Sequence, residues 1–376
     1  MILWQSHHGL PIVARVSVVG DFLPAWKVAA ERPQLETVND WARQARSLTA
    51  HFDDVSVSFA NCECPLNTVG LTPRPLDGLG DIVSAPEMCL EYLAAVRARV
   101  VGIANNHTYD FGAAGVQRTR MAVAARGFSV LGAGLTLETP PGIFLWHGPE
   151  RICVGFWAAA RATSSPATRT SAGVEPATVQ RAQLALQQMK QCGAQFAIAL
   201  LHAGCLRTSY PSPEELHLID AIARAGFDVV AASHSHRISG ARMIARDRES
   251  PAFCFYGLGS IVSGFISTPA EREGLVVVAA LDHNGQLVRL ELRPVLLDRN
   301  GFGVAPTAAE NDAVLGRFIQ FPPILRMVLT CSVFTMKSRP VSRAFTLAIR
   351  EKHFSRAVCE ALLGKSGAFV CTTSAG

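Results

Sequence analysis

Five short runs of mainly apolar residues each lead directly into residues of the types that bind metal ions. Such runs predict β-strands. In α/β sheets, ligands gather beyond the carboxyl ends of the strands, so we expect the five endings to converge on one crevice. The runs and the polar residues that follow them are Val16–Val19 with Gly20-Asp21, Val55–Phe59 with Asn61 and Glu63, Val100–Ala104 with Asn106 and His107, Phe196–Leu201 with His202, and Val229–Ala232 with His234 and His236.

Stretches with helical periodicity lie between these runs, and the alternation predicts an α/β fold. Pro213–Ala225 is the clearest of them, because Ser212 can cap its start, Pro213 suits the first position and Gly226 can end it. The other expected helices are Ala29–Arg46, Ala85–Ala98, Gly115–Arg126 and Ala177–Gln191.

Three later runs follow one another and predict antiparallel strands: Phe253–Tyr256, Leu275–Leu281 and Leu287–Leu292. We therefore expect a second sheet, and a sandwich of two sheets with helices outside. Residues 1–321 are expected to form this domain, and residues 322–376 an appended helical segment.

Composition narrows the classes of function. Hydrophobic residues make up 49% of the 376 residues and charged residues 17%, so a large core is expected. The net charge is +5, but residues 322–376 carry +6 and the rest −1, which argues against a nucleic-acid surface. The sequence has no run of about 18 apolar residues and no signal-peptide pattern, so a cytoplasmic location without a transmembrane segment is expected.

The chemistry of the polar residues is coherent. Two carboxylates, one amide and three imidazoles suit Mn, Fe, Zn or similar divalent ions, with Mg and Ca as further candidates. A carboxylate such as Glu63 can bridge two ions about 4 Å apart. Each residue alone is compatible with a structural role, although His234 and His236 would face one side of an extended segment. Their joint occurrence at strand ends favours a metal site.

The order of these motifs resembles the CapA branch of the calcineurin-like metallophosphatase superfamily, which includes proteins for poly-gamma-glutamate capsule synthesis. The resemblance covers roughly residues 13–300. The matching segments are Val19-Gly20-Asp21, Asn61-Cys62-Glu63-Cys64-Pro65-Leu66, Ala104-Asn105-Asn106-His107-Thr108-Tyr109-Asp110-Phe111-Gly112, His202-Ala203-Gly204, Ser233-His234-Ser235-His236 and Tyr256-Gly257-Leu258-Gly259-Ser260.

The resemblance implies a four-layer α/β/β/α sandwich with one or two divalent ions at one edge. It implies that His107 acts as proton donor or electrostatic stabiliser, and that Asp110 orients His107 or serves as a second acid/base group. The metal ligands that it implies are Asp21, Glu63, Asn106, His202, His234 and His236.

Three departures from the superfamily pattern stand out. Metallophosphatases usually carry Asp-x-His at the first strand, but Leu23 stands at the histidine position, so one metal site is expected to be short of a ligand. Glu63 occupies a position where the wider superfamily has Asp, and Ser233 replaces a Gly before His234. The missing ligand is shared with the CapA branch and argues against ordinary two-metal phosphatase chemistry.

Three functions are compatible with the sequence. The first is a metal-dependent hydrolase or transferase acting on a phosphoester or a peptide-like, polyglutamate-type chain, with a metal-bound water as nucleophile and His107 as general acid. The second is a metal-dependent, cofactor-independent peptide Cα epimerase in the maturation of ribosomal, lasso-type peptides. The third is a non-catalytic accessory protein that holds an acidic polymer. A peptide-like or anionic substrate is expected in each case, and the sequence does not indicate an oligomeric state.

Overall fold

The computed structural model describes residues 1–318 apart from 7–9, 27–34, 75–81, 162–164 and 247–249. The predicted helical segment 322–376 lies outside the described residues. The division of the chain near residue 321 therefore stays a prediction.

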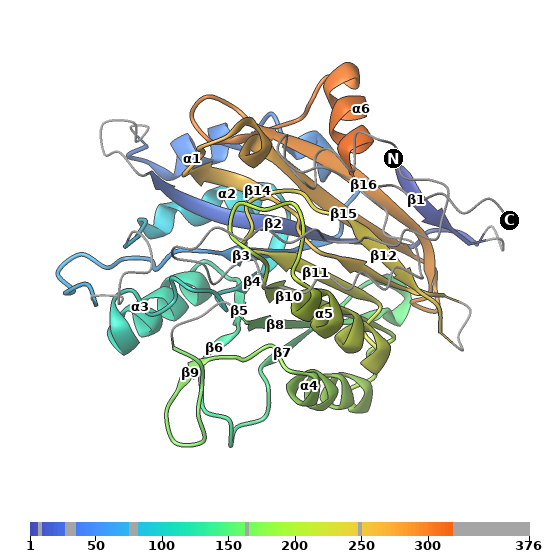
Figure 1. Cartoon of the computed structure of the whole chain (residues 1–376), viewed down its shortest axis with the longest axis horizontal. Helices are drawn as coiled ribbons and strands as arrows, with labels where there is room; N and C mark the ends of the chain where they lie inside the picture. Colours follow the sequence, from blue (N-terminus) through green and yellow to red (C-terminus); the bar gives the residue numbers. More distant parts are fainter. Residues whose placement is uncertain (7–9, 27–34, 75–81, 162–164, 247–249, 319–376) are drawn as a thin grey trace, which may run out of the picture. The chain divides into compact units, whose positions relative to one another are not determined.

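Within the described residues, the larger sheet has nine strands (Figure 1). Its main path runs β1–β16–β15–β2–β3–β4–β5, with β14 paired to β2 and β17 paired to β16. Strands β2 to β5 are parallel, whereas β15 is antiparallel to both of its neighbours. The strands are β1 (Ile2–Gln5), β2 (Ala14–Trp26), β3 (Val57–Cys62), β4 (Ala98–Gly102), β5 (Ser129–Leu131), β14 (Ser260–Gly264), β15 (Glu273–Leu281), β16 (Leu287–Leu297) and β17 (Gly303–Val304).

The smaller sheet has six strands in the described part of the chain, in the order β12–β13–β11–β10–β8–β7. Its central strands β8, β10, β11 and β13 are parallel to one another. The strands are β7 (Ile143–His147), β8 (Cys153–Ala160), β10 (Phe196–His202), β11 (Val229–Ser233), β12 (Ala241–Ile244) and β13 (Ala252–Phe255). A separate short pair joins β6 (Ala133–Leu135) to β9 (Gly173–Val174).

The two sheets pack face to face through the alternation of side chains along each strand. In β8, Phe156 points into the core between the sheets, where its ring lies 5.5 Å from that of Phe59. The next residue, Trp157, points the other way and stacks on Phe227 beneath the helices, 5.7 Å between ring centroids. Because successive residues are buried on opposite faces, the smaller sheet is covered on both sides.

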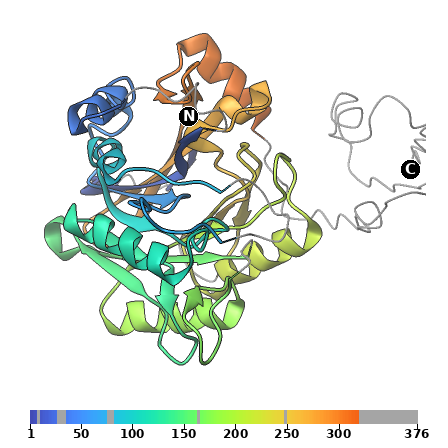
Figure 2. The ribbon, with the colours of Figure 1, turned by 90° about the vertical axis from the view of Figure 1, so that its left-hand side faces the viewer.

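Helices cover the outer faces of the two sheets, as Figures 1 and 2 show. Helices α1 (Val38–Gln44) and α2 (Leu90–Ala95) lie outside the larger sheet, where Tyr92 stacks on Phe22 of β2. Helix α3 (Gly112–Ala125) packs beside β5, and α4 (Val179–Gln191) and α5 (Pro213–Ala225) pack on the smaller sheet. Helix α6 (Ala308–Arg317) packs near β16. The predicted four-layer α/β/β/α arrangement is confirmed.

Local sequence signals placed several helices well. Helix α5 has the predicted bounds, and Ser212 and Glu215 form a capping box at its start. For the predicted helix at Ala29–Arg46, residues 29–34 lie outside the described part of the chain. Within the described part, the helix is shorter than predicted, because it begins at Val38 after a capping box from Thr37 and ends at Gln44. The predicted helix at Ala85–Ala98 is also too long, since Ala98 already begins β4; it contains η3 (Glu87–Cys89) and α2. The remaining short 3-10 turns are η2 (Thr49–His51), η4 (Pro149–Arg151) and η5 (Pro269–Arg272).

The prediction of how the late strands form a second sheet was wrong. The hairpin of β15 and β16 is antiparallel as predicted, but it joins the larger sheet beside β2. The run at Phe253–Tyr256 became β13, which lies parallel to β11 in the smaller sheet and antiparallel to β12. The second sheet is therefore built mainly from the middle of the chain.

Candidate metal centre

The two sheets bring the six predicted metal ligands together at one edge. From the larger sheet come Asp21 in β2, Glu63 just after β3 and Asn106 after β4. From the smaller sheet come the histidines: His202 ends β10, while His234 and His236 follow β11. The expectation that the polar endings converge is confirmed in position, although they come from two sheets.

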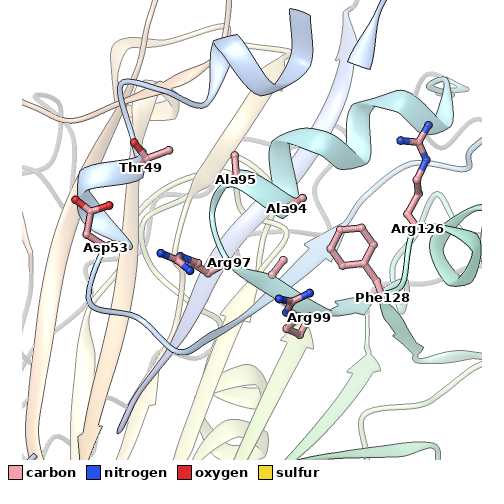
Figure 3. Close-up of a pocket in the computed structure, with 9 residues that line it drawn as sticks. Thr49, Asp53, Ala94, Ala95, Arg97, Arg99, Arg126 and Phe128 are labelled. Atoms are coloured by element: carbon pink, nitrogen blue, oxygen red, sulfur yellow. The ribbon is translucent and has the colours of Figure 1, made fainter. Parts of the chain in front are cut away.

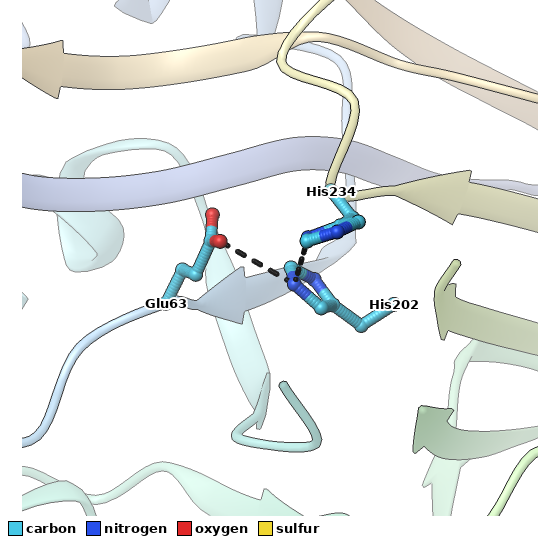
Figure 4. A group of neighbouring side chains, drawn as sticks. All are labelled: Glu63, His202 and His234. Carbon is cyan, nitrogen blue, oxygen red and sulfur yellow. Dashed lines mark hydrogen bonds and ion pairs between the residues drawn. The ribbon is translucent and has the colours of Figure 1, made fainter. Parts of the chain in front are cut away.

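Three predicted ligands meet at one nitrogen of His202. Its Nε2 lies 2.6 Å from Oδ1 of Asn106, 2.9 Å from Nδ1 of His234 and 3.3 Å from Oε1 of Glu63. Figure 4 shows Glu63 and His234 directed at the His202 ring. A single ring nitrogen cannot satisfy three such neighbours by hydrogen bonding. A cation between them can, and Glu63, His202 and His234 form one group of candidate donors.

A second candidate group consists of Asp21, Glu63 and His236. Nδ1 of His236 lies 3.4 Å from Oδ2 of Asp21, and its Nε2 lies 3.7 Å from Oε1 of Glu63. Glu63 is shared by both groups and is fully buried. Among the described residues, neither of its carboxylate oxygens has a hydrogen-bond partner. Buried carboxylate oxygens normally accept hydrogen bonds, so this donor set fits one or two divalent ions.

The residues after Asp21 face the core. Phe22 stacks on Tyr92 with 5.7 Å between ring centroids, and Leu23 is 2% exposed. A histidine ligand is therefore absent from this position. The second group contains three candidate donors.

Burial and mutual charge set the protonation of this cluster. Burial lowers the pKa of His202 to about 3 and also lowers the pKa of His234, so both rings are neutral and can offer a lone pair to a metal. Burial, with the charge of Asp21, raises the pKa of Glu63 to about 8. Burial opposes protonation of His236, but the charges of Glu63 and Asp21 raise its pKa to about 9.

Asp21 occupies the middle of β2 and not its end, which corrects the sequence prediction. The strand changes partner at this point: β15 pairs with it up to Val19, and β14 pairs with it from Asp21 onward. The Asp21 N–H donates to Gly259 O at 2.9 Å. A Cβ on Gly20 would lie 2.1 Å from the same carbonyl oxygen. Gly20 is therefore required for the close approach that positions the carboxylate.

The two histidines after β11 reach the cluster through unusual backbone conformations. His234 and His236 have φ values of 100° and 54°. The prediction that they alternate on an extended segment was therefore wrong, and they belong to different donor groups. The His234 N–H donates to Oδ2 of Asp21 at 2.9 Å. Left-handed conformations at residues other than glycine cost free energy and tend to occur at functional sites.

Two buried asparagines that were not predicted as site residues hold the ligands in place. Asn61 donates from Nδ2 to Oδ1 of Asp21 at 2.7 Å and lies 3.2 Å from Nδ1 of His202. Asn105 donates to Oδ1 of Asn61 at 3.1 Å and to the Cys62 carbonyl at 2.8 Å. The sequence feature that could have identified both residues is an amide side chain at the end of an apolar run, close to a candidate ligand. Such supporting partners fix ligand orientation.

His107 and Asp110 form a hydrogen-bonded pair beside the cluster. Nδ1 of His107 lies 2.9 Å from Oδ2 of Asp110, which also accepts from the Val83 N–H at 3.1 Å. Burial opposes protonation of His107, but the hydrogen bond to Asp110 and the nearby charge of Glu63 raise its pKa. With Nδ1 held by Asp110, Nε2 is the ring nitrogen placed to exchange a proton.

Residues 15–264 match the family described as bacterial capsule synthesis protein PGA_cap. The chain belongs to this family. The predicted resemblance to CapA-like proteins is thereby confirmed, and the match includes all six candidate ligands.

Two relatives of known description are distant from this chain and longer than the matched region. A probable polyglutamine synthesis accessory protein of Mycobacterium tuberculosis is 28% identical over 225 residues, which cover 55% of this chain and 58% of the relative. The capsule biosynthesis protein CapA of Bacillus anthracis is 25% identical over 238 residues, which cover 62% of this chain and 56% of the relative. The chain thus spans less than two thirds of the length of these relatives.

Solved structures with a similar arrangement include a calcineurin-like phosphoesterase, YfkN, from Bacillus subtilis. It has a TM-score of 0.45 and 11% identity, and the match covers 81% of this chain and 96% of the other. The Haemophilus influenzae NAD nucleotidase has a TM-score of 0.43 and 11% identity, with 81% and 55% covered. Among the described residues, no helix has the length and hydropathy needed to cross a bilayer.

Proposed function

We propose that this member of the capsule synthesis protein family is a metal-dependent enzyme that uses His107 as its acid/base group. The proposed substrate is a peptide-like, polyglutamate-type chain or a phosphoester. The observation that carries the proposal is Glu63, a buried carboxylate that two donor groups share and that has no hydrogen-bond partner in the described part of the chain. A purely structural buried carboxylate would accept hydrogen bonds, whereas Oε1 of Glu63 has imidazole nitrogens at 3.3 and 3.7 Å.

The proposed roles of the residues follow from their contacts. A bound divalent ion would supply a Lewis acid and lower the pKa of a coordinated water. Asp110 holds the His107 ring through Nδ1, and the side chain of His107 is 11% exposed, so Nε2 can deliver a proton to a leaving group. Asn61 and Asn105 keep the ligand side chains in register. The candidate ligands are therefore fixed in orientation, in addition to the charge that their carboxylates supply.

Two other functions are alternatives, and one observation favours each of them. A binding role without turnover is favoured by the description of the mycobacterial relative as an accessory protein. Peptide Cα epimerisation is favoured by the His107–Asp110 pair, which could remove and return a proton without hydrolysis. A cytoplasmic location, expected from the sequence, stays a prediction.

The test is turnover of an aryl phosphate and of a γ-linked oligoglutamate by the full chain loaded with Mn²⁺. The informative variant is His107→Ala, and the matched control is His217→Ala, which removes an exposed histidine on α5. We expect turnover of one substrate by wild type and His217→Ala, and a loss of about 10²-fold or more in His107→Ala.

Each other outcome has a clear meaning. Equal turnover by His107→Ala would refute its role as acid/base group. Bound metal without turnover of either substrate would favour the accessory function. Uptake of solvent deuterium at Cα of a candidate peptide, without cleavage, would favour epimerisation.

A further inference from the structure

Two arginines lie on the loops that carry the candidate metal ligands. Arg237 directly follows His236, and Arg207 lies in the loop that begins after His202. The backbone N–H of Arg207 donates to the backbone carbonyl of Ser235 at 2.9 Å, and this hydrogen bond connects the two loops. Arg207 is held with φ at 59°, a conformation that residues other than glycine adopt at a cost.

Both arginines share one buried carboxylate. Glu271, in η5, is 2% exposed. Its Oε1 lies 3.6 Å from Nη2 of Arg237 and 3.9 Å from Nε of Arg207. Its Oε2 accepts from the Ser267 N–H at 2.6 Å. One carboxylate thus lies within ion-pair distance of two guanidinium groups, and the net charge of the three side chains is +1.

Neither arginine makes a close carboxylate pair within the described residues, unlike others in the fold. Arg181 binds Glu175 at 2.6 and 2.9 Å, and Arg246 binds Asp228 at 2.6 Å. Arg237 donates to Oγ1 of Thr268 at 3.1 Å, but among the described residues its buried Nε has no hydrogen-bond partner.

The geometry points to a second-anion subsite: we infer that Arg207 and Arg237 bind an anionic group of the substrate other than the one that reacts. A guanidinium group offers planar, paired donors that match carboxylate and phosphate oxygens. The side chain of Arg207 is 46% exposed, so a ligand can reach it. For a polyglutamate-type chain, the group bound would be a neighbouring side-chain carboxylate.

Another basic site offers a control. A pocket of about 430 Å³ is lined by Arg97, Arg99 and Arg126, together with Thr49, Asp53 and Phe128 (Figure 3). It lies where β4 begins, at the opposite end of that strand from Asn106. Arg126 is already paired with Glu91. Arg99 is exposed, so Arg99→Gln removes the same charge far from the candidate metal centre.

The inference rests on the proposed function for the reaction, but binding can be measured without turnover. The experiment is calorimetric titration of the Mn²⁺-loaded full chain with γ-linked pentaglutamate and, separately, with inorganic phosphate. Wild type is compared with Arg207→Gln, Arg237→Gln and Arg99→Gln, and melting curves establish that each variant is folded. Arg207→Lys keeps the charge but not the paired donors.

We expect pentaglutamate to bind roughly tenfold more weakly to Arg207→Gln and Arg237→Gln, with Arg99→Gln unchanged and partial recovery in Arg207→Lys. Weakened phosphate binding with unchanged pentaglutamate binding would support the subsite and identify its ligand as a phosphate group. Wild-type affinity for both probes in both variants would overturn the inference. So would a loss confined to Arg99→Gln, or no binding by wild type. Arginine-dependent binding without turnover would support the subsite while refuting the proposed catalysis.

Discussion

Replacing Glu63 by Gln should raise the melting temperature of the metal-free protein and abolish the rise that a divalent ion produces. The two effects have one cause. Glu63 is fully buried, and among the described residues its two oxygens have no hydrogen-bond partner. Without an ion, ionising this carboxylate is costly; with an ion, its negative charge would be shared by both donor groups.

The magnitude follows from the pKa. Burial raises the pKa of Glu63 to about 8, compared with about 4.3 for an exposed glutamate. The folded state therefore holds this proton more tightly than the unfolded state, and stability falls as the pH rises from about 4 to about 8. At pH 7 the loss of unfolding free energy is about 3–4 kcal/mol, and the Gln variant avoids it because Gln does not ionise. A shift of several degrees in melting temperature is expected. An ion at 100 times its Kd would stabilise wild type by about 2.7 kcal/mol.

The assay is thermal unfolding at pH 7, before and after addition of Mn²⁺ to chelator-treated protein. The matched control is Glu138→Gln, because the side chain of Glu138 is 64% exposed. The control should melt like wild type in both states. A lower melting temperature for metal-free Glu63→Gln, or an undiminished Mn²⁺ effect in that variant, would refute the reasoning.

Three further predictions test the surroundings of the centre. Gly20→Ala should lower both metal affinity and stability, by about 1–3 kcal/mol in unfolding free energy, because its Cβ would lie 2.1 Å from the Gly259 carbonyl oxygen; Gly316→Ala, with open space around its Cβ, is the control, and equal melting temperatures would contradict the prediction. Phe59→Ala should cost about 3–5 kcal/mol of unfolding free energy in denaturant titrations, since the ring is fully buried between the sheets; a cost below 1 kcal/mol would count against that packing. Metal affinity measured by calorimetry should increase from pH 6 to pH 8, because an ion must displace the proton that Glu63 holds with a pKa of about 8; a flat profile would exclude this competition.

Local signals in the sequence predicted the elements whose bounds depend on nearby residues. Helix α5 begins and ends as expected because Ser212, Pro213 and Gly226 act within one turn of the helix ends. The positions of the candidate ligands were also predictable from nearby residues, because each ligand follows an apolar run closely in the sequence. Ligands gather beyond the carboxyl ends of the strands, so several ligand-type residues that each follow an apolar run together indicate one common site.

Long-range pairing was not predictable in the same way. Strand β15 is buried along its whole length, so its apolar residues do not alternate and carry no information about which sheet it joins. Asp21 was placed at a strand end because its apolar run stops there, yet β14 continues the pairing of β2 beyond it. Histidine adopts positive φ more often than most residues, but an alternating His-x-His pattern favours an extended segment, so the conformations of His234 and His236 were not predicted. Each of these features depends on segments far away in the sequence.

The arrangement of the donors couples the candidate centre to the packing of the two sheets. In each donor group, the carboxylates come from the larger sheet and the imidazoles from the smaller one. An ion in either group would therefore join the sheets, and the distance between its ligands is set by core residues such as Phe59 and Phe156.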